Sequence, residues 1–274
     1  MTDTLNSDPK KTVDSSGFPL QLRIASLIRS SVGWKFPLEE HPWRSSDGQS
    51  EGFIDLTTID DSDLTSMVIE CKRVQQTAWV FLIPDTSPDE KTTSRLWLSV
   101  YSTKWKTFNY NEFQFMPKSY TSKYCAIPGQ DQGRRNSLER TSATLIDSVE
   151  ALALQEGKLF EKSVSKSTSN FVRIYIPIIV TTAELKVASF DPQKISLKDG
   201  FIPNDAYTYI KTVPYIRFRK GLTSNIKALN QDTLHKLHVE MERTVFVVNA
   251  EHFDKFLKKC EPIDIGLIQQ LLAP

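Results

Sequence analysis

Cysteine and net charge are both scarce in this chain. Its 274 residues include three cysteines, with no Cys-x-x-Cys pair and no Cys/His cluster, which argues against a zinc site and against a disulfide scaffold. Lys and Arg total 34 against 33 Asp and Glu, so the formal net charge is +1 and a histone-like protein is excluded, whereas a local basic patch is not. The low counts of 10 Gly and 14 Pro exclude collagen-like and linker-like chains.

Long apolar runs and glycine-rich nucleotide loops are also missing. The N-terminal residues contain no apolar segment like that of a signal peptide, and the longest strongly apolar stretch, residues 174–180, is too short to span a bilayer. Neither GxxxxGK(S/T) nor GxGxxG occurs, which argues against intrinsic ATP or NAD dependence. We therefore expect a soluble protein of a reducing compartment, most simply the cytoplasm, with no membrane partner.

The chain does contain enough apolar material for a core, because 39% of its residues are hydrophobic and 15 of them are Phe. Apolar residues at helical spacing predict a helix over 18–31. A second helix is predicted over 136–160, where Asn136 and Glu139 form a capping box. The remaining predictions are strands at 34–43, 52–58, 66–73, 79–84, 95–101, 171–182, 187–190, 213–219 and 244–249, and helices at 251–260 and 263–272.

The order of these elements predicts how the chain is divided. Residues 1–16 are polar and are expected to form a disordered tail. Residues 17–182 follow the order helix, three strands, helix, strand, which predicts an α/β core with a mixed sheet and an otherwise irregular, aromatic-rich insertion at 75–136. Residues 183–274 are expected to form a C-terminal α+β extension packed on that core.

Two carboxylates and a lysine form the chemically most informative group. Asp55 lies in the middle of one predicted strand, and Glu70 and Lys72 lie near the end of the next. Because side chains alternate faces along a strand, Glu70 and Lys72 share a face, about 6–7 Å apart. In a hairpin of the two strands, Asp55 would lie beside Glu70. Neighbouring carboxylates repel unless a cation lies between them, and oxygen ligands suit Mg²⁺ or Mn²⁺. The backbone carbonyl of Cys71 is a further candidate ligand.

Asp55 followed by Glu70-Cys71-Lys72 resembles the PD-(D/E)xK signature of the restriction-endonuclease-like nuclease superfamily. The resemblance implies a restriction-endonuclease-like αβββαβ core, which is the element order predicted above. It also implies that Asp55 and Glu70 bind a divalent metal ion and that Lys72 positions or activates the hydrolytic water. The motif-bearing part covers about residues 17–84, and the matching element order extends to about residue 182.

This sequence departs from the superfamily pattern at two positions. Ile54, not Pro, precedes Asp55, and Gln21 stands where the first helix often carries a metal-binding acid. Glu40, on the first predicted strand, is a candidate substitute for that acid. The acid-x-Lys pattern alone is weak, and only the Glu70/Lys72 copy combines a buried strand with an upstream Asp. The other copies are Asp8/Lys10, Asp89/Lys91, Glu156/Lys158 and Glu184/Lys186.

Basic residues in two places are candidates for contacts with a phosphate backbone. Arg73 directly follows the motif, and Arg217, Arg219 and Lys220 lie in and after another predicted strand. Contact with nucleic acid is one interpretation of the second group. Protection of an edge strand by charge is the other, and the sequence leaves both open.

These residues predict a Mg²⁺- or Mn²⁺-dependent endonuclease that hydrolyses phosphodiester bonds, with DNA favoured over RNA as the substrate. A role in restriction or anti-phage defence, as a homodimer or with a protein partner, follows only by analogy with the superfamily. The alternative is a catalytically inactive nuclease-like module that binds nucleic acid or a protein. A third hypothesis is that the 75–136 insertion or the C-terminal third binds a signal ligand or partner that activates the nuclease.

Overall fold

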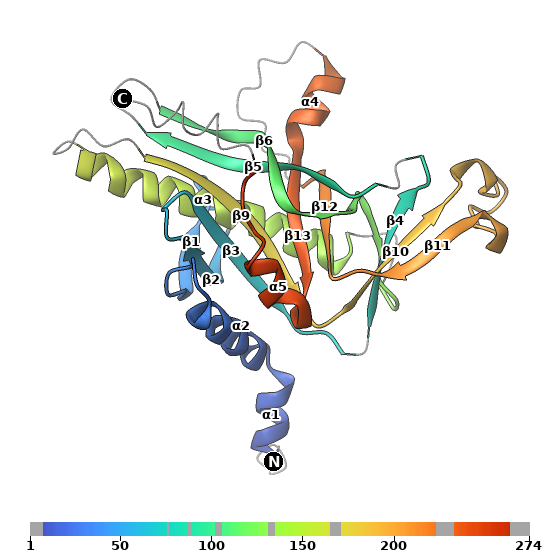
Figure 1. Ribbon diagram of the computed structural model, residues 1–274, viewed down its shortest axis with the longest axis horizontal. Helices are drawn as coiled ribbons and strands as arrows, with labels where there is room; N and C mark the ends of the chain where they lie inside the picture. The colour runs from blue at the N-terminus through green and yellow to red at the C-terminus, as the bar shows by residue number, and fades with distance from the viewer. Residues whose placement is uncertain are drawn as a thin grey trace.

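A nine-stranded mixed sheet forms the centre of the structure, and a four-stranded sheet lies beside it (Figure 1). The computed structural model describes residues 8–75, 77–86, 89–101, 106–130, 135–164, 171–222 and 233–263. The helices are α1 Pro9–Ser15, α2 Phe18–Ser30, α3 Ser137–Val164, α4 Leu234–Met241 and α5 Phe253–Leu257. The strands are β1 Leu38–Arg44, β2 Glu51–Ile59, β3 Thr65–Lys72, β4 Ala78–Pro84, β5 Lys91–Tyr101, β6 Lys106–Ser119, β7 Thr121–Ser122, β8 Tyr124–Ala126, β9 Phe171–Thr181, β10 Glu184–Phe190, β11 Tyr207–Thr212, β12 Tyr215–Gly221 and β13 Glu242–Asn249.

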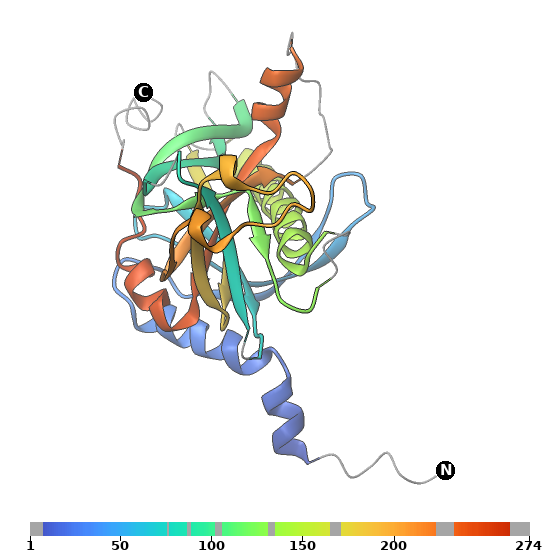
Figure 2. The same cartoon turned by 90° about the vertical axis from the view of Figure 1, so that its right-hand side faces the viewer.

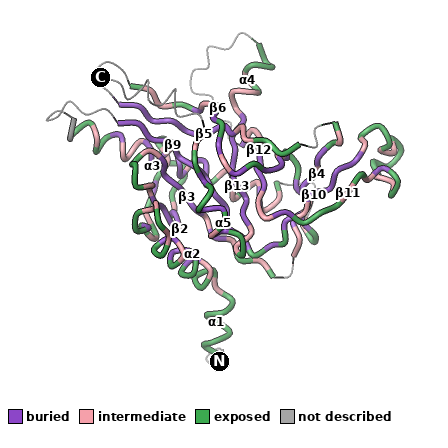
Figure 3. Tube along the Cα trace, in the orientation of Figure 1, coloured by how far each residue is buried: buried purple, intermediate pink, exposed green. Residues whose placement is uncertain are grey.

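The main sheet has the order β1-β2-β3-β9-β13-β12-β7, and the β5–β6 hairpin joins it through β5 and β9. Strands β1, β2 and β3 are antiparallel neighbours, whereas β3, β9 and β13 run parallel. Every residue of β9 is buried, which fits a parallel strand covered on both faces (Figure 3). Each fully buried Ile of β9 contributes about 1.5–3 kcal/mol relative to an exposed one.

Helices cover both faces of the main sheet. Helix α3 packs on one face, and α2 and α5 pack on the other (Figure 2). The predicted helix over 18–31 is confirmed, with Ile24, Ala25 and Ile28 buried at helical spacing. The cap of α3 is also confirmed, because the Asn136 Oδ1 atom accepts a hydrogen bond of 2.9 Å from the Glu139 amide.

Two regions predicted to lack regular structure contain it. Within the predicted tail, Pro9–Ser15 forms helix α1, which has no buried residue and projects from the body of the protein (Figure 1). Within the insertion, Lys106–Ser119 forms the long strand β6, where an irregular segment was expected. The first part of β6 lacks the alternation typical of strands, because its buried residues Tyr110 and Phe113 are three positions apart, and regular alternation begins only at Phe113.

The C-terminal third completes both sheets. Strand β13 lies between β9 and β12 in the main sheet, while β10 and β11 pair with β4 and β8 of the insertion in the four-stranded sheet. The helix predicted over 251–260 is present as a short 3₁₀ turn, Ala250–His252, followed by α5. The helix predicted over 263–272 falls almost wholly outside the described residues.

The three cysteines are free and buried, as expected without a disulfide scaffold. Burial raises the pKa of each thiol well above its usual range, so the thiols are protonated and poorly reactive at neutral pH. Among the helices of the described residues, none combines the length and the apolar character needed to cross a membrane.

Candidate active site

The side of the sheet to which the side chains of β2 point changes at Asp55. Ile54 belongs to the apolar cluster under α3, whereas Leu56, two positions later, belongs to the cluster under α2 and α5. In a regular strand, residues two apart share a face, so the backbone must turn between them. The ladder between β2 and β3 ends at the pair Leu56↔Ile69, directly before this turn. Asp55 and Glu70 therefore lie just beyond the last paired residues of two neighbouring strands.

The side chain of Asp55, and not a backbone carbonyl of β2, accepts a hydrogen bond from the backbone of β3. Its Oδ2 atom accepts a hydrogen bond of 2.7 Å from the backbone N–H of Cys71. This bond holds the carboxylate beside Glu70, as the predicted hairpin requires. Burial is the largest influence on Asp55 and raises its pKa above the usual value, and the hydrogen bond from Cys71 opposes this shift.

Glu70 and Lys72 point to the same side of β3, as their spacing predicts. The Lys72 Nζ atom lies 3.4 Å from Glu70 Oε1, with 26% of the Glu70 side chain and 41% of the Lys72 side chain exposed. Burial, followed by the negative charge of Asp55, raises the pKa of Glu70 to about 7, although Lys72 acts in the opposite direction. The charged form of Glu70 is therefore disfavoured, first by burial and then by the negative charge of Asp55.

A second Glu-x-Lys copy in the chain provides a comparison. In β10, Lys186 Nζ lies 3.0 Å from Glu184 Oε2, so the local geometry resembles that of Glu70 and Lys72. Hydrogen bonds from Thr212 and Lys186 lower the pKa of Glu184 below its usual value. The difference arises because Glu70 is partly buried beside another carboxylate. The motif alone does not create the unusual electrostatics of the site.

Gln21 and Glu40 belong to the same group of side chains. The Gln21 Nε2 atom donates to Glu40 Oε1 at 2.5 Å and to the backbone oxygen of Asp55 at 3.1 Å. Glu40 has a φ of 52°, a left-handed conformation that is strained for a residue other than glycine. Its negative charge raises the pKa of both Asp55 and Glu70. The structure thus places Glu40 beside the predicted site, on β1, and shows that Gln21 contacts it from α2.

The donor set suits a divalent cation that keeps part of its water shell. Asp55 and Glu70 supply hard oxygen atoms, and the mutual repulsion of three nearby carboxylates would be relieved by a bound cation. Within the described ranges, no three His, Cys, Asp or Glu side chains are grouped so that they could hold a metal ion together. Two direct carboxylate ligands, with water and substrate oxygens as the others, match this arrangement.

Arg217 does not lie on a surface that could contact nucleic acid, and this prediction is wrong. The side chain is fully buried, with 0% exposure. It donates five hydrogen bonds that join β12 to β5 and β6, so its N–H donors are satisfied by neutral acceptors inside the protein. The acceptors are Ser94 Oγ at 2.8 Å, Pro117 O at 2.8 Å, Ser119 Oγ at 2.7 Å, Thr92 O at 3.2 Å and Phe115 O at 2.5 Å.

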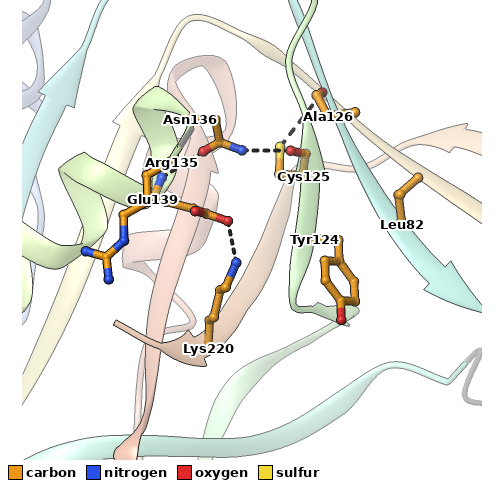
Figure 4. Close-up of a pocket in the computed structure, with 8 residues that line it drawn as sticks. All are labelled: Leu82, Tyr124, Cys125, Ala126, Arg135, Asn136, Glu139 and Lys220. Carbon is orange, nitrogen blue, oxygen red and sulfur yellow. Dashed lines mark hydrogen bonds and ion pairs between the residues drawn. The ribbon is translucent and has the colours of Figure 1, made fainter. Parts of the chain in front are cut away.

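Arg219 and Lys220 are bound to carboxylates. Arg219 pairs with Glu242 at 2.8 Å and with Glu112 at 2.5 Å. Lys220 pairs with Glu139 in a pocket of about 390 Å³ at the start of α3, where its ammonium points toward that carboxylate (Figure 4). Their strand, β12, is separated from β3 by β9 and β13, a distance of about 14 Å across the sheet. The structure therefore does not bring these two cations to the carboxylate site.

Arg73 is the candidate cation nearest to the site in the chain. It follows the last residue of β3 and is exposed.

Cys71 pairs with Val180 of β9, and its side chain is buried in the apolar cluster under α2 and α5. Its backbone N–H donates a hydrogen bond to Asp55, while the role of its carbonyl as a metal ligand stays a prediction.

Comparison of the chain with models of protein families, with curated proteins and with solved structures finds no match. The chemistry of the site must therefore be derived from its own residues.

Proposed function

We propose that this protein is a Mg²⁺- or Mn²⁺-dependent nuclease that hydrolyses phosphodiester bonds, with DNA as the favoured substrate. The observation that carries the proposal is the convergence of Asp55, Glu70 and Lys72 where the β2–β3 ladder ends. Burial and the neighbouring charge of Asp55 raise the pKa of Glu70 at this point. Perturbed carboxylates beside a lysine are typical of catalytic sites.

Asp55 and Glu70 would hold the cation directly, and Glu40 would bind it through a water molecule or after a change of rotamer. A divalent cation bound there supplies Lewis acidity, which lowers the pKa of water and polarises a phosphoryl oxygen. The hydrogen bond from Cys71 fixes Asp55 without occupying its second oxygen. The contacts of Gln21 hold Glu40 close to both ligands.

Lys72 would act on the substrate and the attacking water. Its ammonium lies beside Glu70, and 41% of its side chain is exposed. With a cation held by Glu70, the Lys72 ammonium would be free to contact a phosphate oxygen of the substrate. There it would position the water and stabilise the negative charge that develops on the phosphate.

The arrangement of the elements supports a restriction-endonuclease-like core. Helix α2, strands β1, β2 and β3, helix α3 and strand β9 follow one another in the order αβββαβ, interrupted by the insertion. The first three strands are antiparallel neighbours, and β9 lies parallel to β3. In this sheet the proposed ligands lie on adjacent strands near one end of β3.

Cleavage of labelled DNA in Mg²⁺ or Mn²⁺, with EDTA as the control, tests this function. Lys72→Ala should slow cleavage about a hundredfold or more. The matched control is Lys186→Ala, which removes the lysine of the second Glu-x-Lys copy and should leave the rate unchanged. Equal rates for Lys72→Ala and wild type would refute the assignment of the site.

The non-catalytic alternative differs in its metal affinity. A nuclease-like module that only binds nucleic acid or a protein would have no need to hold a cation at Asp55 and Glu70. Wild-type protein that fails to bind millimolar Mn²⁺, measured by electron paramagnetic resonance, would favour that alternative. Gln21 in the place of an acid is the feature that keeps it under consideration.

A further inference from the structure

A surface pocket lies along the hairpin of β1 and β2, and we refer to it as the hairpin pocket. It has a volume of about 670 Å³, which is within the range of sites that bind small organic groups. Most of its lining comes from the hairpin itself, with one residue contributed by α3. The lining residues used here are Pro42, Trp43, Arg44, Gly52, Phe53 and Gln155.

The hairpin pocket lies near the proposed active site along the β1–β2 hairpin. Pro42 pairs with Phe53, and the next pair along the hairpin is His41 with Ile54. Glu40 and Asp55 are the next residues on the two strands, but they are not paired in the ladder. Two residues of a strand span about 7 Å, so the pocket lies about one nucleotide away from the carboxylates.

The lining suits a flat apolar ring. Phe53 lines the pocket and is 62% exposed, so much of its ring is accessible to a ligand. Trp43 is only 4% exposed and its indole packs on Gly52, where a Cβ atom would lie 3.3 Å from the indole nitrogen. The glycine thus keeps this part of the hairpin free of a side chain.

Two residues of opposite charge, Arg44 and Glu51, also line the pocket. Arg44 forms an exposed ion pair with Glu51 across the hairpin, which is a weak interaction in water. A phosphate group can therefore compete with Glu51 for the guanidinium, and the repulsion between the phosphate and that carboxylate opposes the exchange. An aromatic face beside an arginine is the combination that binds unpaired nucleotides with little sequence preference.

We propose that the hairpin pocket binds an unstacked base adjacent to the scissile phosphate, so that the substrate is single-stranded or locally unpaired nucleic acid. This inference rests on the proposed function, because the carboxylates define where cleavage occurs. A duplex keeps its bases stacked and paired, so a nucleotide must leave the stack to reach Phe53. A protein partner that docks on the exposed ring is the competing occupant, and the test below separates the two.

The experiment measures binding of a fluorescent single-stranded 12-mer and of the matching duplex, in Ca²⁺, to the full chain. Phe53→Ala should weaken binding of the single strand roughly five- to hundredfold, and duplex binding should change much less. Phe53→Trp should retain the affinity, because it keeps an aromatic face. The matched control is Phe201→Ala, since Phe201 is 64% exposed and lies outside the hairpin, in the connection between β10 and β11. Thermal melting checks that each variant is folded.

A second measurement locates the bound base relative to the scissile bond. In cleavage of a single strand with one abasic position, wild type should lose activity when the missing base is next to the scissile bond, and Phe53→Ala should be insensitive to its loss. Unchanged single-strand affinity in Phe53→Ala, with cleavage intact, would overturn the inference and leave the nuclease proposal standing. Absence of both binding and cleavage in wild type would overturn both, and would favour a protein occupant.

Discussion

At the scale of single residues, the proposed metal ligand Glu70 affects the stability of the fold. Its pKa of about 7 in the folded protein exceeds the usual 4.5 because the carboxyl is buried and lies near Asp55. A group whose pKa is higher in the folded state than in the unfolded state contributes its full stabilisation at pH values below the unfolded-state pKa. That contribution is lost as the pH rises through the folded-state pKa. The metal-free protein is therefore destabilised by Glu70 at neutral and alkaline pH, since the charged form is the disfavoured one.

Replacement of this carboxyl by an amide should reverse the effect. We expect Glu70→Gln to stabilise the metal-free protein by about 1–3 kcal/mol at pH 8 and to have almost no effect at pH 4. Urea unfolding in EDTA at the two pH values measures the difference between variant and wild type. A difference that does not depend on pH would show that Glu70 titrates normally.

Glu40 should contribute to metal binding although it lies on a different strand. Its strained backbone and its hydrogen bond from Gln21 keep the carboxylate near Asp55 and Glu70. We expect Glu40→Gln to weaken Mn²⁺ binding about tenfold or more, in a titration followed by electron paramagnetic resonance. Glu39→Gln is the matched control, because Glu39 is the adjacent acid but pairs with Arg29. Equal affinities in the two variants would remove Glu40 from the site.

At the scale of elements, Arg217 joins β12 to the β5–β6 hairpin. Its guanidinium supplies hydrogen bonds to three backbone carbonyls and two hydroxyl groups that are otherwise enclosed. Burial lowers its pKa to about 10, so it still carries its charge at neutral pH. Unpaired buried carbonyls are costly, which makes this residue a structural one.

The loss of this arginine should destabilise the whole sheet. We expect Arg217→Met to lower the unfolding free energy by about 3 kcal/mol or more, and the melting temperature by roughly 6–12 °C. Arg44→Met, at an exposed ion pair, should change the stability by less than about 0.5 kcal/mol. Calorimetry on both variants measures this, and similar melting temperatures for the two would contradict the structural role of Arg217.

At the scale of the whole molecule, local sequence patterns predict the elements better than they predict the contacts between them. The helix over 18–31 and the strand over 171–182 follow from periodicity and apolar runs, and both are present. The proximity of Asp55 to Glu70 was predictable because both lie on neighbouring strands of a short hairpin. The αβββαβ order likewise depends only on the sequence of local signals.

Other features depend on contacts between distant parts of the chain. Gln21 reaches a backbone oxygen 34 positions away, which no local pattern indicates. Arg217 looks like a surface residue in a basic stretch, and its burial arises from carbonyls about a hundred positions earlier. The left-handed turn at Glu40 is strained for a glutamate, so residue preferences argue against it. Such features become visible only when the sheet is assembled.

The central claim is tested most directly by the rate of DNA cleavage by wild type, Asp55→Ala and Lys72→Ala under single-turnover conditions. Supercoiled plasmid, linear duplex, single-stranded DNA and RNA serve as substrates, with Mg²⁺ or Mn²⁺ present and EDTA as the control. We predict cleavage by wild type that requires the metal, prefers single-stranded or unpaired DNA, and falls by orders of magnitude in both variants. Equal cleavage by wild type and both variants would contradict the claim, because the chemistry would then lie at another site.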